Sequence, residues 1–185
     1  MTDLTQIAHQ VGVSERTLRR AVAEGTLRGE RSSPRRLMLS ALEKDYVLRR
    51  WALLGTLRTA LRTEHNVRFA LLFGSSARGD DADGSDVDLL VAMRDPSLSR
   101  TIDLELKLEG LLGRAVEVVT LEDAEANPRL LAEALREGRV IVDREGRWPE
   151  VQAETEKVGR RARDHERRLL RHALSAVDRV PAGGG

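Results

Sequence analysis

The stretch Phe73–Val91, FGSSARGDDADGSDVDLLV, decides the fold predicted for this chain of 185 residues. It begins at the end of the apolar segment Val67–Phe73 (VRFALLF), which is rich in residues that favour a buried strand. Gly74-Ser75 then predicts a sharp turn into a helix N-terminus, where free backbone N–H groups attract anions. After a polar loop, Ser85–Met93 (SDVDLLVAM) predicts a second strand that enters the core.

Two aspartates stand at the entrance of this second strand. Asp86 and Asp88 are two positions apart, so in a strand they project from the same face. Neighbouring carboxylates repel each other and are costly to bury unless a cation lies between them, and Mg²⁺ prefers such hard oxygen ligands. Two other interpretations are an acidic surface hairpin and a structural Ca²⁺ site. We expect Asp80, Asp81 and Asp83 to be solvated turn residues.

The order of these elements resembles the active-site motif of the DNA polymerase β-like nucleotidyltransferases, above all their minimal branch. In that pattern a Gly-Ser pair is followed by ten residues and then Asp-x-Asp, as in Gly74-Ser75 and Asp86-Val87-Asp88. The resemblance covers about Val67 to Asp143 and implies an α/β (α+β) fold, with a small mixed sheet flanked by helices. It also implies that Gly74 and Ser75 hold the phosphates of ATP, while the aspartates bind two Mg²⁺ ions.

Members of that family have a third carboxylate on a later strand, usually an aspartate. Here the candidate is Glu117, in the predicted strand Arg114–Thr120, and its longer side chain departs from the family pattern. The alternative is an exposed glutamate on an edge strand. Arg78 is expected to contact the nucleotide phosphates, or else to pair with an aspartate of the loop. The four histidines show no spacing typical of metal ligands.

The N-terminal segment Leu4–Gly29 predicts a helix, a turn at Gly12 and a second helix capped by Ser14. It resembles the helix-turn-helix of MerR-type winged DNA-binding domains, with Arg28–Ser40 in the place of the wing. The resemblance implies contacts with duplex DNA, and the arginines expected to make them are Arg16, Arg19, Arg20, Arg35 and Arg36. The alternative is a helical hairpin that contacts another protein.

Charge and pattern divide the chain into parts. Residues 1–62 carry 12 Lys and Arg against 6 Asp and Glu, whereas residues 63–185 carry 19 against 24. A basic front followed by an acidic remainder indicates two functions. We predict a DNA-binding domain over 1–39, a connecting helix over 40–64, a nucleotidyltransferase domain over 65–146, a basic helix over 147–180 and a disordered tail over 181–185.

The composition indicates in which cellular compartment the protein is expected. The chain has no cysteine and no apolar run long enough to cross a bilayer, so we expect a cytoplasmic protein without membrane contact. MerR-like modules act as pairs, which favours a homodimer.

The resemblance to minimal nucleotidyltransferases also implies a function. Members of this type are often antitoxins that transfer AMP to a tyrosine of a partner HEPN toxin, and a DNA-binding front would suit an antitoxin that represses its own operon. Two alternatives stay open. One is a transcription regulator whose nucleotidyltransferase fold senses nucleotide without effective catalysis. The other is a transferase that modifies a small molecule or a tRNA.

Overall fold

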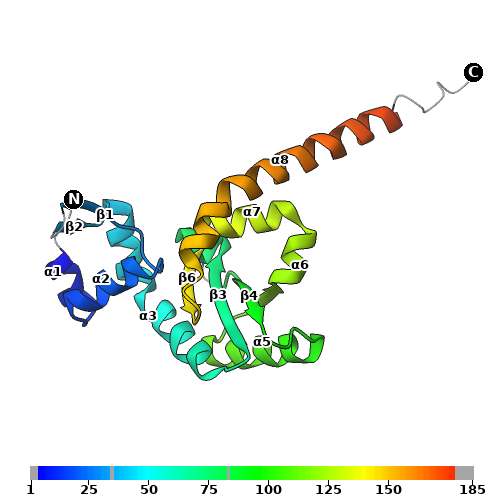
Figure 1. Cartoon of the computed structure of the whole chain (residues 1–185). Coiled ribbons are helices and arrows are strands. Elements are labelled where there is room, and N and C mark those ends of the chain that lie inside the picture. Colours follow the sequence, from blue (N-terminus) through cyan, green and yellow to red (C-terminus); the bar gives the residue numbers. More distant parts are fainter. Residues whose placement is uncertain (1–3, 34–35, 83, 178–185) are drawn as a thin grey trace, which may run out of the picture.

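A computed structural model describes residues 4–33, 36–82 and 84–177 of the chain (Figure 1). Within these residues the elements follow one another as α1 (Leu4–Gln10), α2 (Glu15–Ala23), β1 (Glu30–Ser33), β2 (Arg36–Met38), α3 (Ala41–Thr63), β3 (Val67–Phe73), α4 (Gly74–Arg78), β4 (Val87–Met93), α5 (Leu98–Leu112), β5 (Val116–Thr120), α6 (Leu121–Ala126), α7 (Pro128–Glu137), β6 (Arg139–Asp143) and α8 (Trp148–Val177).

A mixed four-stranded sheet forms the centre of the molecule, in the order β5-β4-β3-β6. β3 pairs antiparallel with both β4 and β6, and β4 pairs parallel with β5. Six of the seven residues of β3 are buried, because helices cover both faces of the sheet. The predicted small mixed sheet flanked by helices is therefore confirmed.

Alternate residues of the strands belong to two separate hydrophobic clusters. Ala70 and Leu72 of β3 face a cluster that includes residues of α3 and α5. Phe69, Leu71 and Phe73 face the other cluster, to which α6, α7 and the start of α8 contribute. The sheet is thus the middle layer of three. α8 packs along α7 and then extends beyond the rest of the molecule (Figure 1).

The N-terminal elements form a small unit of two helices and a hairpin. Gly12, with φ of +71°, makes the turn between the helices, and the Ser14 side chain caps α2 by accepting a hydrogen bond from Thr17 N–H. β1 and β2 pair antiparallel at the position expected for a wing. Arg35 lies outside the described residues, as does the side chain of Arg36, so their DNA contacts stay predictions.

This unit is joined to the sheet through the edge strand β6. The Val140 N–H donates to the Gly25 carbonyl at 3.1 Å, and the Thr26 hydroxyl donates to the Val140 carbonyl at 2.6 Å. The indole of Trp148 lies against Gly25, where any Cβ would collide with the ring. Through these contacts the N-terminal unit packs directly on the sheet. They also partly cover the free edge of β6.

The structure corrects some element boundaries. β4 begins at Val87 and β5 at Val116, each two residues after the predicted start. The short helix α6 was not predicted. The predicted tail 181–185 lies outside the described residues. Among the helices that the structure describes, none has a stretch both long and apolar enough to cross a membrane.

Candidate active site

Three carboxylates meet where β4 and β5 begin. Asp88 is the second residue of β4 and Asp86 immediately precedes that strand. In the parallel pairing of β4 with β5, Asp88 lies in register with Glu117, while Phe73 of β3 lies beside it on the other flank. Adjacent strands are about 4.8 Å apart, so Asp88 and Glu117 are direct neighbours. The structure therefore brings the three predicted acids to one end of the sheet.

The turn after β3 approaches the same point. Gly74 has φ of +67°, and a Cβ added there would collide with the Asp88 carboxylate. Glycine is thus required both by the left-handed backbone and by the close approach. The turn leads into α4, which begins at Gly74 without a side-chain cap and ends at Gly79 with φ of +84°. Backbone donors at Gly74 and Ser75 consequently lie beside the carboxylates.

The electrostatics of the three acids are those of an uncompensated negative site. Burial raises the pKa of Asp88 above its ordinary value, and the nearby charges of Glu117, Asp86 and Glu133 raise it further, while Arg78 acts in the opposite direction. In the part of the chain that the structure describes, the carboxylates of Asp86, Asp88 and Glu117 have no hydrogen bond or ion pair to a protein group.

Glu117 combines both sequence interpretations. It is exposed on the edge strand β5, yet it lies beside Asp88 in the register of the sheet. An edge strand leaves one flank of the acidic site open to solvent. An acceptor molecule would therefore be able to approach the carboxylates from that side.

Asp81 is not the solvated turn residue that the sequence predicted. Its side chain is fully buried, at 0% exposure, and forms ion pairs with Arg50 of α3 and with Arg114 just before β5. The Arg114 guanidinium also donates to the Ser76 hydroxyl at 2.7 Å and to the Asp86 carbonyl at 3.1 Å. This network holds the loop before β4 in place, so it positions the backbone at Asp86.

Arg78 has acidic partners of its own. Its guanidinium donates to Asp80 at 3.1 Å and to Glu137 of α7 at 2.8 Å, and Glu133 lies 3.5 Å away. The interpretation that Arg78 pairs with a loop aspartate is thus realised in this structure. A phosphate contact would require the guanidinium to exchange at least one of these partners.

A buried arginine fixes the far end of α4. Arg139 of β6 is 2% exposed, pairs with both carboxylate oxygens of Glu43 at 2.6 and 3.0 Å, and donates to the Ala77 carbonyl at 2.6 Å. Its guanidinium lies over the Tyr46 ring at 3.4 Å, and the Tyr46 hydroxyl donates to the Ser76 carbonyl. Sequence reasoning missed this cluster, because its members are far apart in the chain.

The carboxylates of Asp86 and Asp88 fit a Mg²⁺ ion that is bound together with the phosphates of a nucleotide. Among the described residues, no group of three His, Cys, Asp or Glu side chains is arranged to hold a metal ion by itself. Mg²⁺ is usually bound by one or two carboxylates together with water and substrate phosphates, so a complete protein cage is not needed. Asp86 and Asp88 are hard oxygen donors that form no ion pair with a cationic side chain of the described residues, and such a complex requires this donor set.

The arginines predicted to contact DNA differ in their surroundings. Arg19 pairs with Glu15, and Arg20 pairs with Glu24. Arg16 is exposed, and no acidic partner is found for it among the described residues. Arg16 and Arg20 both line a cleft between α2 and the sheet domain.

Comparison with protein families identifies the part of the chain that carries this site. Residues 56–147 match the profile of the family described as Polymerase beta, Nucleotidyltransferase. This segment is similar to the nucleotidyltransferases of that family. The match contains the Gly74 turn, both aspartates and Glu117, so the acids described above lie within the matched segment.

Similar proteins agree with this assignment. A protein adenylyltransferase MntA from Thermococcus cleftensis is 47% identical over 60 residues, which are 32% of this chain and 61% of the relative. The chain thus spans about three-fifths of the length of the curated relatives it matches.

Solved structures show that the fold of the nucleotidyltransferase domain is shared. A crystal structure of a toxin–antitoxin with AMP-PNP has a TM-score of 0.55 at 19% identity, covering 65% of this chain and 98% of that chain. A tri-AMPylated Shewanella oneidensis HEPN toxin in complex with an MNT antitoxin has a TM-score of 0.53 at 16% identity, covering 68% of this chain and 98% of that chain.

Proposed function

We propose that this chain is a Mg²⁺-dependent nucleotidyltransferase that transfers AMP from ATP to a hydroxyl group of an acceptor. The observation that carries the proposal is the set of Asp86, Asp88 and Glu117. These acids lie together beside the Gly74 turn, without partners among the described residues, in a segment that matches a nucleotidyltransferase family. A site that gathers negative charge in this way is complementary to a metal–triphosphate complex.

The residues have distinct roles in this proposal. Asp86 and Asp88 hold Mg²⁺, and the Gly74-Ser75 backbone holds the triphosphate. Bound Mg²⁺ supplies charge stabilisation to the attacking and leaving oxygens. The acceptor oxygen forms a bond to the α-phosphorus while the bond to the β-phosphate oxygen breaks and pyrophosphate leaves. Glu117 either completes the ligand set or takes the acceptor proton, and its exposed position leaves room for the acceptor.

We further propose that the acceptor is a tyrosine of a partner HEPN-type toxin and that the chain acts as its antitoxin. The support is that curated relatives are named protein adenylyltransferases, and that structures with the same fold are toxin–antitoxin complexes. A cytoplasmic setting would give the site both ATP and such a partner.

Transfer of label from α-³²P-ATP tests this function. Purified chain, Mg²⁺ and the product of the neighbouring gene should give labelled protein, and label should be lost with Asp86→Asn/Asp88→Asn. Asp103→Asn is the matched control, because Asp103 is an exposed aspartate of α5. Label that persists in the double variant would refute the site assignment, whereas active enzyme that leaves the neighbour unlabelled would refute only the acceptor.

The N-terminal unit supports a second role in the same protein. We propose that α1, α2 and the β1–β2 hairpin bind duplex DNA as a homodimer and repress the chain's own operon. Two helices joined by a Gly12 turn and followed by a hairpin support this role. Binding in gel shifts should weaken steeply with salt, because neutralised phosphates release counterions. If DNA affinity changes with ATP while no label is transferred, the nucleotide-sensing regulator replaces the enzyme.

A further inference from the structure

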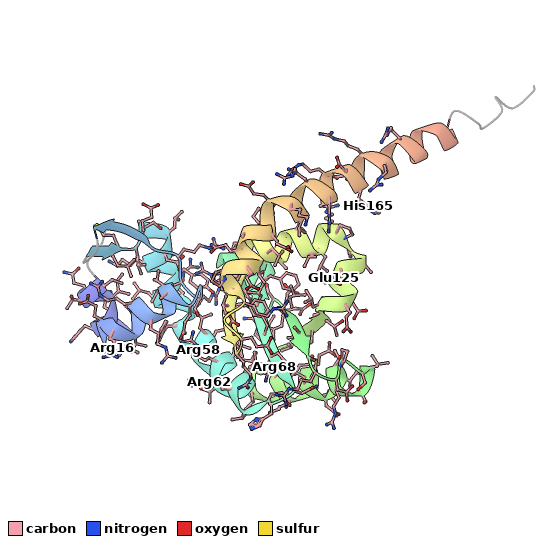
Figure 2. All side chains as sticks on the ribbon, viewed as in Figure 1. Arg16, Arg58, Arg62, Arg68, Glu125 and His165 are labelled. Atoms are coloured by element: carbon pink, nitrogen blue, oxygen red, sulfur yellow. The ribbon has the colours of Figure 1, made fainter. Side chains whose placement is uncertain are left out.

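A cleft of about 670 Å³ separates α2 from the sheet domain. One wall is α2, the second is the C-terminal half of α3, and the third is β6 with the turn that leads into α8. Figure 2 labels Arg16 on α2, and Arg58 and Arg62 on α3. None of the residues proposed for catalysis lines this cleft, so it is separate from the acidic site.

The charge of the cleft is strongly positive. Its lining includes five arginines and two acids, namely Arg16, Arg20, Arg58, Arg62, Arg144, Glu24 and Asp143. Both acids are already engaged. Glu24 pairs with Arg20 and Arg58, and the Asp143 carboxylate accepts backbone N–H groups of Glu145, Arg147 and Trp148.

Arg144 is held by backbone carbonyls, whereas two other arginines of the cleft have no side-chain contact of this kind with the described residues. For Arg16 and Arg62, the described part of the chain supplies neither an ion pair nor a side-chain hydrogen bond. Both side chains are exposed, so they are free to close on a ligand. They lie on opposite walls of the cleft, one on α2 and one on α3.

Arg58 lies deeper than these two. Its side chain is 24% exposed and donates to the Thr26 hydroxyl at 2.6 Å. Burial lowers the pKa of Arg58, Glu24 raises it, and the charges of Arg20 and Arg62 lower it again. A recessed cation among other cations is stabilised by an anion small enough to enter the cleft.

The wall formed by β6 and the turn into α8 is partly apolar. Ile141 and Val142 of β6 contribute to it together with Trp148, whose indole is only partly buried. A cavity of this volume, with an apolar patch and a few converging charged groups in its lining, is typical of small-molecule sites. An indole surface and several guanidinium groups together suit a planar base that carries phosphates.

We propose that this cleft is a second nucleotide site, which binds a nucleoside polyphosphate independently of the catalytic acids. Arg16, Arg58 and Arg62 hold the phosphates, and the base lies against Trp148. A duplex fits the cleft less well, because a convex DNA backbone reaches the exposed Arg16 and Arg62 more readily than the recessed Arg58. The ligand would bridge α2 and β6, and thus the two parts of the molecule.

Isothermal titration of the full chain tests this site. The titration uses Asp86→Asn/Asp88→Asn protein in EDTA, with ATP and GTP as probes, so that metal-dependent binding at the catalytic site is absent. We expect one binding event that Arg16→Ala/Arg62→Ala weakens at least tenfold. Arg161→Ala should leave it unchanged, since Arg161 is an exposed arginine of α8 outside the cleft. Arg62→Ala alone serves if the double variant unfolds.

Fluorescence reports on the base. The chain has two tryptophans, so Trp51→Phe leaves Trp148 as the single reporter. ATP should change its emission, whereas inorganic triphosphate should bind more weakly and change it less. Equal affinity for triphosphate with unchanged emission would overturn the nucleotide assignment. The proposal is also overturned by ATP affinity that survives the arginine changes, by no nucleotide binding at all, or by duplex DNA binding that alone depends on Arg16 and Arg62.

Discussion

Replacing Arg139 by methionine should destabilise the protein by about 4 kcal/mol. Among the described residues, the change leaves the Glu43 carboxylate, which is 5% exposed, with only the backbone N–H of Arg28 as a donor, at 2.9 Å. It also removes the donors to the Ala77 and Thr26 carbonyls and the contact with the Tyr46 ring. Removing one partner of a buried ion pair typically costs about 3–5 kcal/mol, because a buried charge is left uncompensated.

The double variant Arg139→Met/Glu43→Met separates this cost from simple loss of packing. Without either charge, the cluster becomes an apolar contact, and the expected cost falls to about 1–2 kcal/mol. The coupling free energy between the two positions should therefore be at least about 2 kcal/mol. Arg160→Met is the matched control, because Arg160 and Glu156 form an exposed pair that is worth less than about 1 kcal/mol.

Urea unfolding followed by circular dichroism and by tryptophan fluorescence measures these free energies. Both probes should give the same midpoint if the two parts of the molecule unfold together. The single variant should also melt about 8–16 °C lower than the wild type. A cost of less than about 1 kcal/mol for Arg139→Met, or a double variant as unstable as the sum of the single ones, would refute the structural role of the pair.

Three further predictions follow from individual residues. Asp88→Asn should abolish AMP transfer. It should also raise the free energy of unfolding at pH 7, because the raised pKa of Asp88 means that its charge opposes folding. This gain in stability should fade in melts below about pH 4, and equal stability of variant and wild type at pH 7 would contradict the prediction. Burial raises the pKa of Tyr46, the single tyrosine, to about 12, and the charge of Arg139 opposes the rise. Absorbance at 295 nm should therefore show ionisation near that pH, and the free energy of unfolding should fall between about pH 10 and 12. Ionisation near pH 10 in the folded protein would refute the burial of Tyr46. Gly74→Ala should lower the free energy of unfolding by about 1–2 kcal/mol from backbone strain alone. It should also abolish AMP transfer, since the added methyl group displaces the Asp88 carboxylate. An active variant would refute the close approach of the turn to Asp88.

The active-site turn was largely predictable from sequence because its signals are local. The bounds of β3 match the prediction, since a continuous apolar run ends at Gly74. α3 begins immediately after Ser40, and the Ser40 side chain caps the helix. Serine is among the residues preferred at this position. The two-residue spacing of Asp86 and Asp88 predicted a shared strand face, whereas β4 begins at Val87, so Asp88 lies in the strand and Asp86 immediately before it.

Other parts of the site depend on residues distant in the chain. Asp81 stands in a run that reads as a polar turn, yet it is buried because Arg50 and Arg114 neutralise it from 31 and 33 residues away. Glu117 meets Asp88 only through the parallel register of β4 and β5. A one-residue shift of that register would turn Glu117 to the opposite face.

The sequence by itself therefore determined the extent of β3, the turn at Gly74 and the cap of α3 at Ser40, because each follows from neighbours within a few residues. Only the tertiary structure decided that Arg139 lies beneath α4, that Asp81 is buried and that α2 faces β6 across a basic cleft. These features depend on tertiary contacts between groups of opposite charge or complementary shape that are distant in the chain. Sequence patterns that describe local backbone conformation carry no information on such contacts.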